Sequence, residues 1–432
     1  MIAMELERAA MDTFEGQAPG LLDAAARSGL RKSLSAIQHG RLRIVDGDRE
    51  NVFGEAKPEY PVSATVVVHD PSFYKDVLFG GSVGAGEAYM RGAWSADDLA
   101  AVVQILVRNL EALSAMEGGW ASLLTPVRRA YHALRGNTRS GSRSNIAAHY
   151  DLGNDFFALF LDETMTYSCG IFERPTTTLR EASEAKYDRI CRKLALGPGD
   201  RVIEIGTGWG GFAIHAAGRY GCHVDTATIS RRQFELAERR VREAGLSERV
   251  RLLLSDYRDL AGTYDRLVSI EMIEAVGHTY LPKFFEMCGR LLAPHGAMAL
   301  QAITIRDQVA YAHRSSVDFI KRYIFPGSYI PSIAEIISCV ARETDMQLCH
   351  LEDLTPHYAT TLKTWRERFL ARVPEIRAMG YPESFLRMWE FYLAYCEGSF
   401  REHYNGNVQM IFRKPHCPLE PVLPPLAETA LA

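Results

Sequence analysis

Between residues 201 and 304, short apolar runs alternate with segments of helical pattern. The runs are RVIEIG (201–206), HVDTATI (223–229), RVRLLLSD (249–256), DRLVSIE (265–271) and GAMALQAIT (296–304). Helical segments such as 231–244 and 280–293 separate them. Apolar strands that alternate with helices are typical of a parallel sheet covered by helices on both faces. The pattern therefore predicts an α/β fold for this part of the chain.

The first run leads into a glycine-rich loop, residues 206–211, which is followed by a helical segment. Glycines let the backbone approach a ligand closely, and a helix start offers unpaired N–H groups to a negative group. A dinucleotide dehydrogenase has a similar loop, but it needs an acidic residue about 20 positions further on to hold the ribose. Here the next run ends in TIS (228–230) with Gln233 following, and the acid, Glu204, precedes the glycines. A merely structural strand, turn and helix is the alternative interpretation.

Composition and charge exclude several classes of protein. The 432 residues carry a formal net charge of -4, which argues against nucleic acid as the main partner. No stretch approaches the roughly 20 continuous apolar residues of a membrane span, and the first thirty residues contain several acids. The eight cysteines form no C-x-x-C pair, which indicates reduced thiols in a cytosol and argues against zinc and disulfides.

The first part of the chain has a different pattern. Before about residue 60 the sequence is helix-like and weakly patterned, which predicts a tethered segment rather than a core. Residues 64–69 predict a strand, and 97–114 predict a helix with acidic residues at its start. The five glycines of 79–94 predict tight turns at a packing or binding surface.

A basic strip, residues 126–146, marks the clearest boundary. It contains five arginines and no acidic residue, and it ends in a stretch rich in glycine, serine and asparagine. It is either a solvated hinge or a surface for anionic lipid headgroups. We therefore expect an N-terminal lipid-associated domain (1–125), a basic linker (126–146), a catalytic domain (147–415) and a C-terminal tail (416–432). Within the catalytic domain, 365–400 look helical and 408–414 predict a closing edge strand.

The motif E-x-G-x-G-x-G, which starts at Glu204, resembles class I S-adenosylmethionine-dependent methyltransferases. The resemblance implies a Rossmann-like sheet with a smaller N-terminal α+β domain. It also implies that Glu204 faces the amino acid end of the cofactor or orders the loop around it. In LSDYRDL (254–260), Asp256 is then expected to accept the adenine amino group, with Tyr257 beside the ring.

The segment AAHYDLGNDFFALFLDETMTYSCGIF (147–172) resembles the cyclopropane fatty acid synthase family. The resemblance continues through SIEMIEAVGHTYLPKFF and DFIKRYIFPGSYIPS to FYLAYCEGSFREHYNGNVQMIF, so it covers residues 145–414. Residues 79–94 resemble the N-terminal domain of longer, bacterial-type members, which is thought to help hold the lipid. The family implies transfer of a methylene unit to the cis double bond of an unsaturated phospholipid acyl chain, which forms a cyclopropane ring.

In this family, a bound bicarbonate ion deprotonates the carbocation formed when the double bond attacks the sulfonium methyl. By motif, Glu274 and Tyr358 would hold the bicarbonate with main-chain groups near Cys169 and Ile303, and Gln301 lies in the same region. These roles predict that Glu274→Gln keeps cofactor affinity while cutting turnover severely. The cofactor-binding residues implied by the family, with no metal ligand among them, are Tyr167, Ser168, Glu204, Gly206, Thr207, Gly208, Gly210, Gly211, Thr228, Ile229, Gln233, Asp256 and Tyr257.

Each catalytic candidate also has a structural interpretation. Cys169 could be a small buried hydrophobe, and we expect it to position rather than attack, because the reaction needs no thiolate. Glu274 could cap a helix, and Tyr358 could be an ordinary half-buried tyrosine. Beside an anion, Glu274 must be protonated or accept a hydrogen bond, and burial favours the protonated form.

The sequence departs from many family members at two positions. They carry histidine where this chain has Ala275 and Gln301, although Gln301 can still donate and accept hydrogen bonds. The same motif forms resemble enzymes that leave a methylene group for a partner reductase, giving a methyl-branched acyl chain, so both products stay open. A small-molecule methyltransferase and a non-catalytic lipid-binding protein are the alternatives from other classes. The family further implies a homodimer in the cytoplasm, peripheral to the inner face of the membrane.

Overall fold

The computed structural model describes residues 21–116, 152–420 and 422, so the predicted basic linker lies outside the described residues. The chain divides into two compact units. Unit 1 comprises residues 1–163, 305–329 and 355–406, and unit 2 comprises 164–304, 330–354 and 407–432. Residues 305–329 and 355–406, which lie far after the glycine loop in sequence, therefore belong to the same unit as the N-terminal elements.

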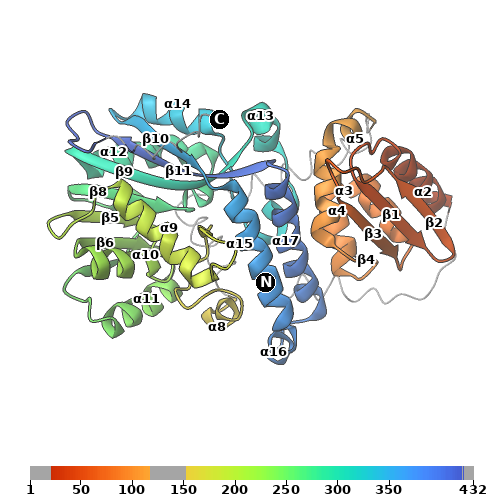
Figure 1. The fold of residues 1–432 in the computed structure, drawn as a ribbon, viewed down its shortest axis with the longest axis horizontal. Helices are drawn as coiled ribbons and strands as arrows, with labels where there is room; N and C mark the ends of the chain where they lie inside the picture. The colour runs from red at the N-terminus through yellow and green to blue at the C-terminus, as the bar shows by residue number, and fades with distance from the viewer. Residues whose placement is uncertain (1–20, 117–151, 421, 423–432) are drawn as a thin grey trace, which may run out of the picture. The chain divides into compact units, whose positions relative to one another are not determined.

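A seven-stranded sheet forms the centre of unit 2, in the order β10-β11-β9-β8-β5-β6-β7 (Figure 1). The pairs between β5 and β6, β6 and β7, β5 and β8, and β8 and β9 are parallel, whereas β10 and β11 are antiparallel. This arrangement confirms the predicted Rossmann-like α/β sheet. Its strands are β5 (Arg201–Ile205), β6 (His223–Thr228), β7 (Val250–Leu254), β8 (Tyr264–Ile270), β9 (Leu292–Ile305), β10 (Gln347–Asp353) and β11 (Asn405–Arg413).

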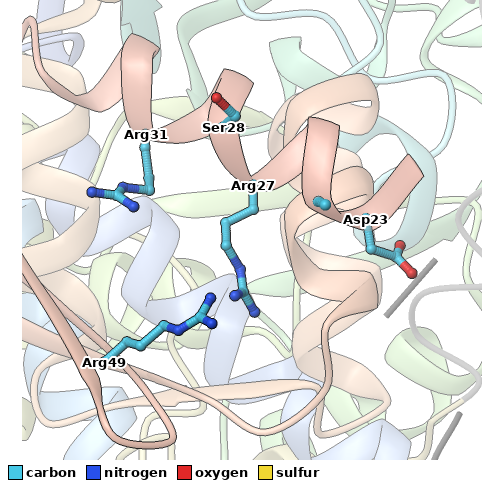
Figure 2. A pocket seen from close by; sticks show the side chains of 6 residues that line it. Asp23, Arg27, Ser28, Arg31 and Arg49 are labelled. Carbon is cyan, nitrogen blue, oxygen red and sulfur yellow. The ribbon is translucent and has the colours of Figure 1, made fainter. Parts of the chain in front are cut away.

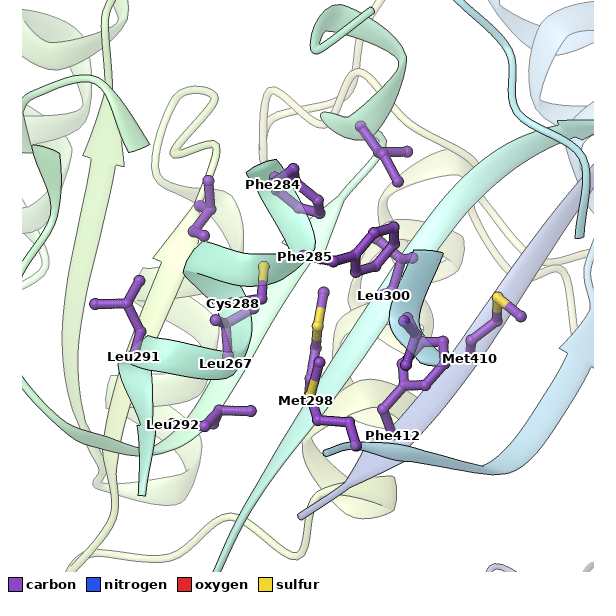
Figure 3. Close-up of a cluster of buried hydrophobic side chains, with 14 of the residues drawn as sticks. Leu267, Phe284, Phe285, Cys288, Leu291, Leu292, Met298, Leu300, Met410 and Phe412 are labelled. Carbon is purple, nitrogen blue, oxygen red and sulfur yellow. The ribbon is translucent and has the colours of Figure 1, made fainter. Parts of the chain in front are cut away.

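Helices cover both faces of this sheet because successive strand residues point to opposite sides. On one face, Leu267 and Met298 join a buried cluster with Phe284 and Phe285 of a covering helix (Figure 3). On the other face, the neighbouring Val268 packs into a second cluster. The first face is covered by α12 (Leu281–Leu291) and α14 (Ile333–Glu343), and the second by α9 (Leu179–Lys193), α10 (Gly211–His215), the π-helix η2 (Ala216–Tyr220) and α11 (Arg231–Glu243).

The predicted strand at 408–414 exists, but its predicted place at the edge is wrong. β11 lies between β9 and β10, and β10 is the edge strand. Met410 and Phe412 face one buried cluster while Ile411 faces the other, so both faces of β11 are covered. A strand that is apolar on both faces is typical of the sheet interior. Residues 408–412 have this pattern, so the sequence could have predicted an interior position for β11.

Unit 1 contains a four-stranded sheet in the order β2-β1-β3-β4. The predicted strand at 64–69 is confirmed as β3 (Ser63–Val68). The described part of the weakly patterned segment, from residue 21, is also structured, contrary to our expectation. β1 (Arg41–Asp46) and β2 (Arg49–Phe53) form an antiparallel hairpin whose turn contains Gly47 at φ 57°. Leu42 and Ile44 alternate with exposed arginines, so only a short stretch shows the strand period. The sheet is completed by β4 (Trp94–Ala96) and accompanied by α2 (Leu21–Leu34).

The glycine-rich segment 79–94 is largely helical, so the predicted turns are wrong except after the helix, where Gly92 lies in a turn with φ 79°. It lies mostly in α3 (Ser72–Met90), which is kinked at Gly81 with φ 55°. A Cβ on Gly84 would lie 1.8 Å from the Asp76 carbonyl oxygen, and one on Gly86 would lie 2.3 Å from the Phe319 ring. These glycines therefore permit close packing within unit 1.

Two long helices, α15 (Thr355–Ala371) and α17 (Glu383–Arg401), with the short α16 (Val373–Ala378) between them, account for the helical prediction over 365–400. α17 packs against α4 (Leu99–Arg108), where a Cβ on Gly398 would lie 2.7 Å from Val103. Asp98 caps α4 by accepting from the Ala101 N–H, as the acidic start predicted. In the described part of unit 1, the remaining helices are α5 (Leu110–Met116), α8 (Asn154–Ala158), α13 (Asp307–Ser315) and the π-helix η6 (Ile320–Ile324).

None of the helices that the structure describes is both long and apolar enough to cross a membrane. All eight cysteines lie in the described ranges as free thiols. Within those ranges, no group of three or more histidine, cysteine or acidic side chains could hold a metal ion.

Candidate active site

The predicted site residues of unit 2 gather at the carboxyl ends of its parallel strands. The chain order reverses between β5 and β8, because β6 and β7 extend the sheet on one side and β9 on the other. Open α/β sheets bind their ligands in the crevice at such a reversal. The glycine loop follows β5, and Glu274 follows β8 in the short 3-10 helix η4 (Ile273–Ala275).

The glycine loop has the backbone that its sequence requires. Gly206, Gly208 and Gly210 have φ values of 106°, 52° and 85°, which residues other than glycine rarely adopt. Gly211 opens α10, and a Cβ there would lie 2.6 Å from the Tyr187 hydroxyl. The loop thus turns tightly and keeps its main chain at the carboxyl ends of the parallel strands.

Glu204 is buried under this loop, with 2% of its surface exposed. The Thr226 hydroxyl donates to its Oε2 at 2.6 Å and lies 2.7 Å from the Thr207 hydroxyl. Burial raises the pKa of Glu204 to about 8, although the Thr226 hydrogen bond and the nearby Lys186 charge act in the opposite direction. Glu204 therefore connects β5 to Thr207 of the loop, which corresponds to the ordering role that the motif predicted.

The ends of β6 and β7 carry the remaining cofactor candidates. The Thr228 hydroxyl donates to Gln233 Oε1 at 2.9 Å, and half-buried Ile229 follows it. Asp256 is paired with the buried Arg258, whose Nε and Nη2 donate at 2.8 and 2.6 Å. The carboxylate predicted to accept the adenine amino group is thus already held by an arginine that the sequence analysis did not single out.

Tyr257 begins the 3-10 helix η3 (Tyr257–Asp259), and its ring packs on Phe284 with centroids 5.6 Å apart. Its hydroxyl is buried, finds no partner among the residues that the structure describes, and burial raises its pKa. A buried hydroxyl without a partner marks a position where a ligand atom can bind.

Lys186 is a further site residue that the sequence did not reveal. Its side chain is fully buried in α9, and Nζ donates to the Ser168 hydroxyl at 2.6 Å. Tyr167, which precedes Ser168, is half-buried. The signal for Lys186 was weak, because a lysine in an otherwise charged helix usually faces solvent.

Glu274 has an unusual carboxyl group. Its Oε1 accepts the main-chain N–H of Ile303 at 2.5 Å, and its Oε2 is buried without a hydrogen-bond partner among the described residues. Part of the side chain keeps some exposure, but the carboxyl end does not. Burial, and then the charge of Glu271, raise the pKa of Glu274 to about 8, so the protonated form is favoured at neutral pH.

Glu271 is the second carboxylate of the site and was missed from the sequence. Its Oε1 accepts three N–H groups: the Cys169 main chain at 3.0 Å, Gln301 Nε2 at 2.8 Å and Asn407 Nδ2 at 2.7 Å. Its backbone has φ 47°. An acid directly at the carboxyl end of β8, three residues before the motif glutamate, was the signal that could have identified it.

A chain of buried polar groups continues from Gln301. Gln301 Oε1 accepts from Gln409 Nε2 at 3.0 Å, and Gln409 Oε1 accepts from Lys193 Nζ at 2.8 Å. Lys193 also pairs with Glu352 at 2.6 Å, and Arg189 donates to the same carboxylate. Burial disfavours the Glu352 carboxylate, but the hydrogen bonds from Arg189 and Lys193 outweigh burial and lower its pKa to about 2.

Cys169 is fully buried, and its thiol lies 3.2 Å from the Gly170 carbonyl oxygen. Its main chain donates to Glu271 and accepts from Gln301 Nε2 at 3.3 Å. Both contacts use the backbone and not the sulfur, as expected for a positioning role.

Tyr358 belongs to unit 1, so its approach to Glu274 stays a prediction. There it is buried, and its ring centroid lies 4.5 Å from that of Phe400.

The chain is similar to proteins of known activity over most of its length. Residues 137–410 match the family model described as mycolic acid cyclopropane synthetase. A tuberculostearic acid methyltransferase of Mycobacterium tuberculosis is 41% identical over 374 residues, which cover 85% of this chain and 86% of the relative. A cyclopropane-fatty-acyl-phospholipid synthase of Escherichia coli is 38% identical over 81% of this chain and 88% of the relative.

Solved structures are also similar. A mycolic acid cyclopropane synthase complexed with SAH and CTAB has a TM-score of 0.60 and 33% identity, and the match covers 63% of this chain and 98% of that chain. A cyclopropane synthase from Mycobacterium tuberculosis has a TM-score of 0.59 and 34% identity, with the same coverage.

Proposed function

The chain belongs to the mycolic acid cyclopropane synthetase family and is an S-adenosylmethionine-dependent methyltransferase, and from this premise we propose that it modifies the cis double bond of phospholipid acyl chains. The proposed product is a cyclopropane ring. The observation that carries the proposal is the 38% identity to a cyclopropane-fatty-acyl-phospholipid synthase over 81% of the chain. The match to a cyclopropane mycolic acid synthase covers only 60% of this chain, whereas the match to the phospholipid enzyme covers 81%.

The second candidate product is a methylene-bearing acyl chain, which a partner reductase converts to a methyl branch. The specific observation in its favour is the 41% identity to a tuberculostearic acid methyltransferase. Both products require the same early steps, because the double bond attacks the sulfonium methyl and a proton then leaves the new methyl group.

S-adenosylmethionine is proposed to bind along the glycine loop and the ends of β6 and β7. The main-chain N–H groups of Gly206, Thr207 and Gly210 already donate to carbonyl oxygens, so within the loop Gly208 and Gly211 offer theirs. The unpartnered hydroxyl of Tyr257 offers a polar contact. The bound cofactor supplies the electrophilic methyl group. Glu204 keeps the loop in place through Thr226 and Thr207.

The bicarbonate ion that the family resemblance implies fits the described residues poorly. The two main-chain N–H groups that would hold it, those of Cys169 and Ile303, donate instead to Glu271 and Glu274. An additional anion between these two acids would have to displace a carboxylate of the chain from its hydrogen bonds. We therefore derive no step through bicarbonate.

Contact with an anionic membrane surface is supported by a basic pocket in unit 1. The pocket has a volume of about 400 Å³, and its charged lining residues are Arg27, Arg31 and one acid, Asp23, of α2 and Arg49 of β2 (Figure 2). Arg27 pairs with Asp46 at 2.5 Å, whereas Arg31 and Arg49 have no ion pair among the described residues. Guanidinium groups bind phosphate oxygens in bidentate geometry, so a phospholipid headgroup is the proposed occupant.

Vesicle flotation tests the basic pocket. Replacing both Arg31 and Arg49 with Glu should weaken binding to phosphatidylglycerol vesicles by about tenfold or more, since each basic residue near the surface contributes on the order of 1 kcal/mol. Replacing both Arg231 and Arg239 with Glu, on exposed positions of α11, is the charge-matched control. Equal binding by the pocket variant and this control would exclude the pocket as the site that binds the headgroup.

The predicted basic linker, the homodimer and the cytoplasmic location at the inner face of the membrane stay predictions.

The activity is tested with purified protein, S-adenosylmethionine and vesicles of dioleoyl phosphatidylglycerol. Mass spectrometry should find an acyl chain heavier by one CH₂ unit and resistant to mild hydrogenation. A hydrogenation-sensitive product of the same mass would favour the methylene product. No change in any acyl chain would contradict the proposed function.

A further inference from the structure

The N–H groups that could bind an anion in this site already donate to a carboxylate of the protein. Three N–H donors from separate segments, those of Cys169, Gln301 and Asn407, converge on one carboxylate oxygen of Glu271. A carboxylate is planar and carries one negative charge, as bicarbonate does. We propose that Glu271 is the general base of the reaction and takes the place and the role of bicarbonate. The inference rests on the proposed function and names its base.

The two oxygens of Glu271 are suited to different tasks. Oε1 is held by three donors at 2.7 to 3.0 Å, whereas Oε2 accepts no hydrogen bond from the residues that the structure describes. Glu271 is only half-buried, and Oε2 does not belong to the buried polar atoms that lack a partner, so this oxygen is not enclosed by the protein. Three N–H donors stabilise the charged form of the carboxylate, which must be ionised to accept a proton.

Glu274 has the opposite environment. Its carboxyl group is shielded, has one main-chain donor and lies close enough to feel the charge of Glu271. Three N–H donors meet the Glu271 carboxyl group, whereas a single N–H donor meets that of Glu274. Glu274 is therefore the neutral partner and Glu271 the anionic one.

The backbone of Glu271 indicates that the carboxylate is held there against a conformational cost. Its φ of 47° lies in the left-handed region, which residues other than glycine adopt only at a conformational cost. Such outliers persist where the surrounding structure over-determines them. Here the Glu271 main-chain N–H also donates to the Gln301 carbonyl oxygen at 2.8 Å, which fixes the residue to β9.

The proposed step balances without a further reactant. The double bond uses its π pair to bond the sulfonium methyl carbon, the S–CH₃ bond breaks toward sulfur, and a carbocation remains on the acyl chain. Oε2 of Glu271 then takes a proton from the new methyl group. The released C–H pair closes the three-membered ring with the cationic carbon. In the methylene route, a hydride first shifts from the methyl-bearing carbon to the adjacent cationic carbon, and the released C–H pair then forms a double bond to the methyl-bearing carbon. Glu271 leaves this step as a carboxylic acid and returns its proton to water.

Gln301 and Asn407 are positioning residues in this scheme, and Lys193 sets the orientation of the glutamine pair. An ammonium group only donates, so Gln409 must turn its oxygen to Lys193 and its nitrogen to Gln301. Gln301 must then present its oxygen to Gln409 and its nitrogen to Glu271. Glutamine at position 301 is thus suited to donate a hydrogen bond to the Glu271 carboxylate.

Turnover in bicarbonate-free buffer tests the proposal. Wild-type turnover on dioleoyl phosphatidylglycerol vesicles should be the same with and without added bicarbonate. Glu271→Gln should reduce turnover by about 100-fold or more, as the loss of a general base does, while S-adenosylmethionine affinity stays within about twofold. Glu271→Gly, which suits the positive φ, should be inactive without bicarbonate and regain at least about tenfold when bicarbonate enters the freed cradle.

The controls separate this proposal from the proposed function. Glu286→Gln removes an exposed carboxylate from α12 and should behave as wild type. A wild-type enzyme that loses turnover when bicarbonate is removed, or a Glu271→Gln variant that keeps its turnover, would overturn the role of Glu271 while leaving the activity intact. A wild-type enzyme that makes no product in either buffer would overturn the proposed function itself.

Discussion

At the scale of single residues, the site depends on two glutamates whose surroundings differ. Glu271 meets three donors, whereas Glu274 has one donor and a buried second oxygen. Residue type alone made Glu274 the prominent candidate, because it lies in the recognisable motif. The contacts instead assign the charge to its neighbour.

The rate of the wild-type enzyme should fall as pH rises through about 8. The pKa of Glu274 is raised to about 8, so this group is neutral below that pH and becomes a second anion beside Glu271 above it. Glu274→Gln is neutral at every pH and should abolish this alkaline decline, with turnover at pH 7 within about tenfold of wild type. This revises the severe loss that the sequence predicted for the variant. A loss of about 100-fold or more at pH 7 would favour the original role.

Glu204→Gln should become progressively more stable relative to wild type as pH rises from about 5 to 8. The folded-state pKa of Glu204 is about 8, above its usual 4.5, so the unfolded chain releases this proton first. Wild-type stability from this group is complete below the unfolded pKa and is lost as pH rises toward the folded one, by at most about 1.4 kcal/mol per pH unit. Urea unfolding at several pH values measures the difference. A pH-independent difference between the two proteins would contradict the buried, protonated state.

At the scale of elements, contacts between helices and strands fix side-chain orientations that no single element encodes. Lys193 ends α9, Gln409 lies in β11 and Gln301 in β9, yet their hydrogen bonds form one directed chain. The antiparallel β10 contributes Glu352, which holds Lys193 from the other side.

Lys193→Met should lower turnover by about tenfold and leave S-adenosylmethionine affinity unchanged. Methionine keeps the apolar stem but not the ammonium donor, so the two glutamine amides lose their fixed direction. Lys193→Arg should restore part of the rate. Lys283→Met, on an exposed position of α12, is the matched control. A lower affinity for the cofactor with unchanged turnover would assign Lys193 a purely structural role.

Gly398→Ala should destabilise unit 1 by roughly 1 to 3 kcal/mol, the usual cost of overpacking. The added methyl carbon would lie 2.7 Å from Val103 and 2.9 Å from the Ala100 carbonyl oxygen, so α17 would have to move away from α4. Gly199→Ala, where nothing lies within 4 Å, is the control and should be neutral. Thermal unfolding distinguishes the two, and equal melting temperatures would show that this contact can relax.

At the scale of the whole molecule, the two units are not consecutive in sequence. Unit 1 combines the N-terminal sheet with residues 305–329 and 355–406, so segments on both sides of unit 2 share one core. Tyr89 of α3 packs on Phe391 of α17 with ring centroids 5.7 Å apart, and the Tyr89 hydroxyl donates to Glu390 at 2.8 Å. The N-terminal residues thus contribute to the packing of helices far along the chain.

Removal of residues 1–125 should therefore expose apolar surface on α17 and reduce the thermal stability of the remaining chain. Phe391 and Gly398 would lose their partners Tyr89 and Val103. Binding of a hydrophobic dye, measured with the melting temperature, checks this prediction. A truncated chain that melts at the wild-type temperature and binds no dye would show that α17 does not depend on the N-terminal elements.

The sequence by itself determined the parallel strands β5 to β9 of unit 2 and the glycine loop, but it did not predict β10 or the place of β11. Local patterns were sufficient there, since buried parallel strands read as apolar runs and a tight loop at positive φ requires glycine. The same reasoning failed at β1, whose alternation spans only a few residues, and at α3, where glycines serve packing and not turns.

Only the tertiary structure decided how the site is charged. The three donors to Glu271 lie 102, 30 and 136 residues away in the chain, so no local pattern relates them. The raised pKa of Glu274 likewise depends on burial and on a neighbouring charge, and both exist only after folding. Residue type placed acids at the end of β8, and the fold selected which of them is held as an anion.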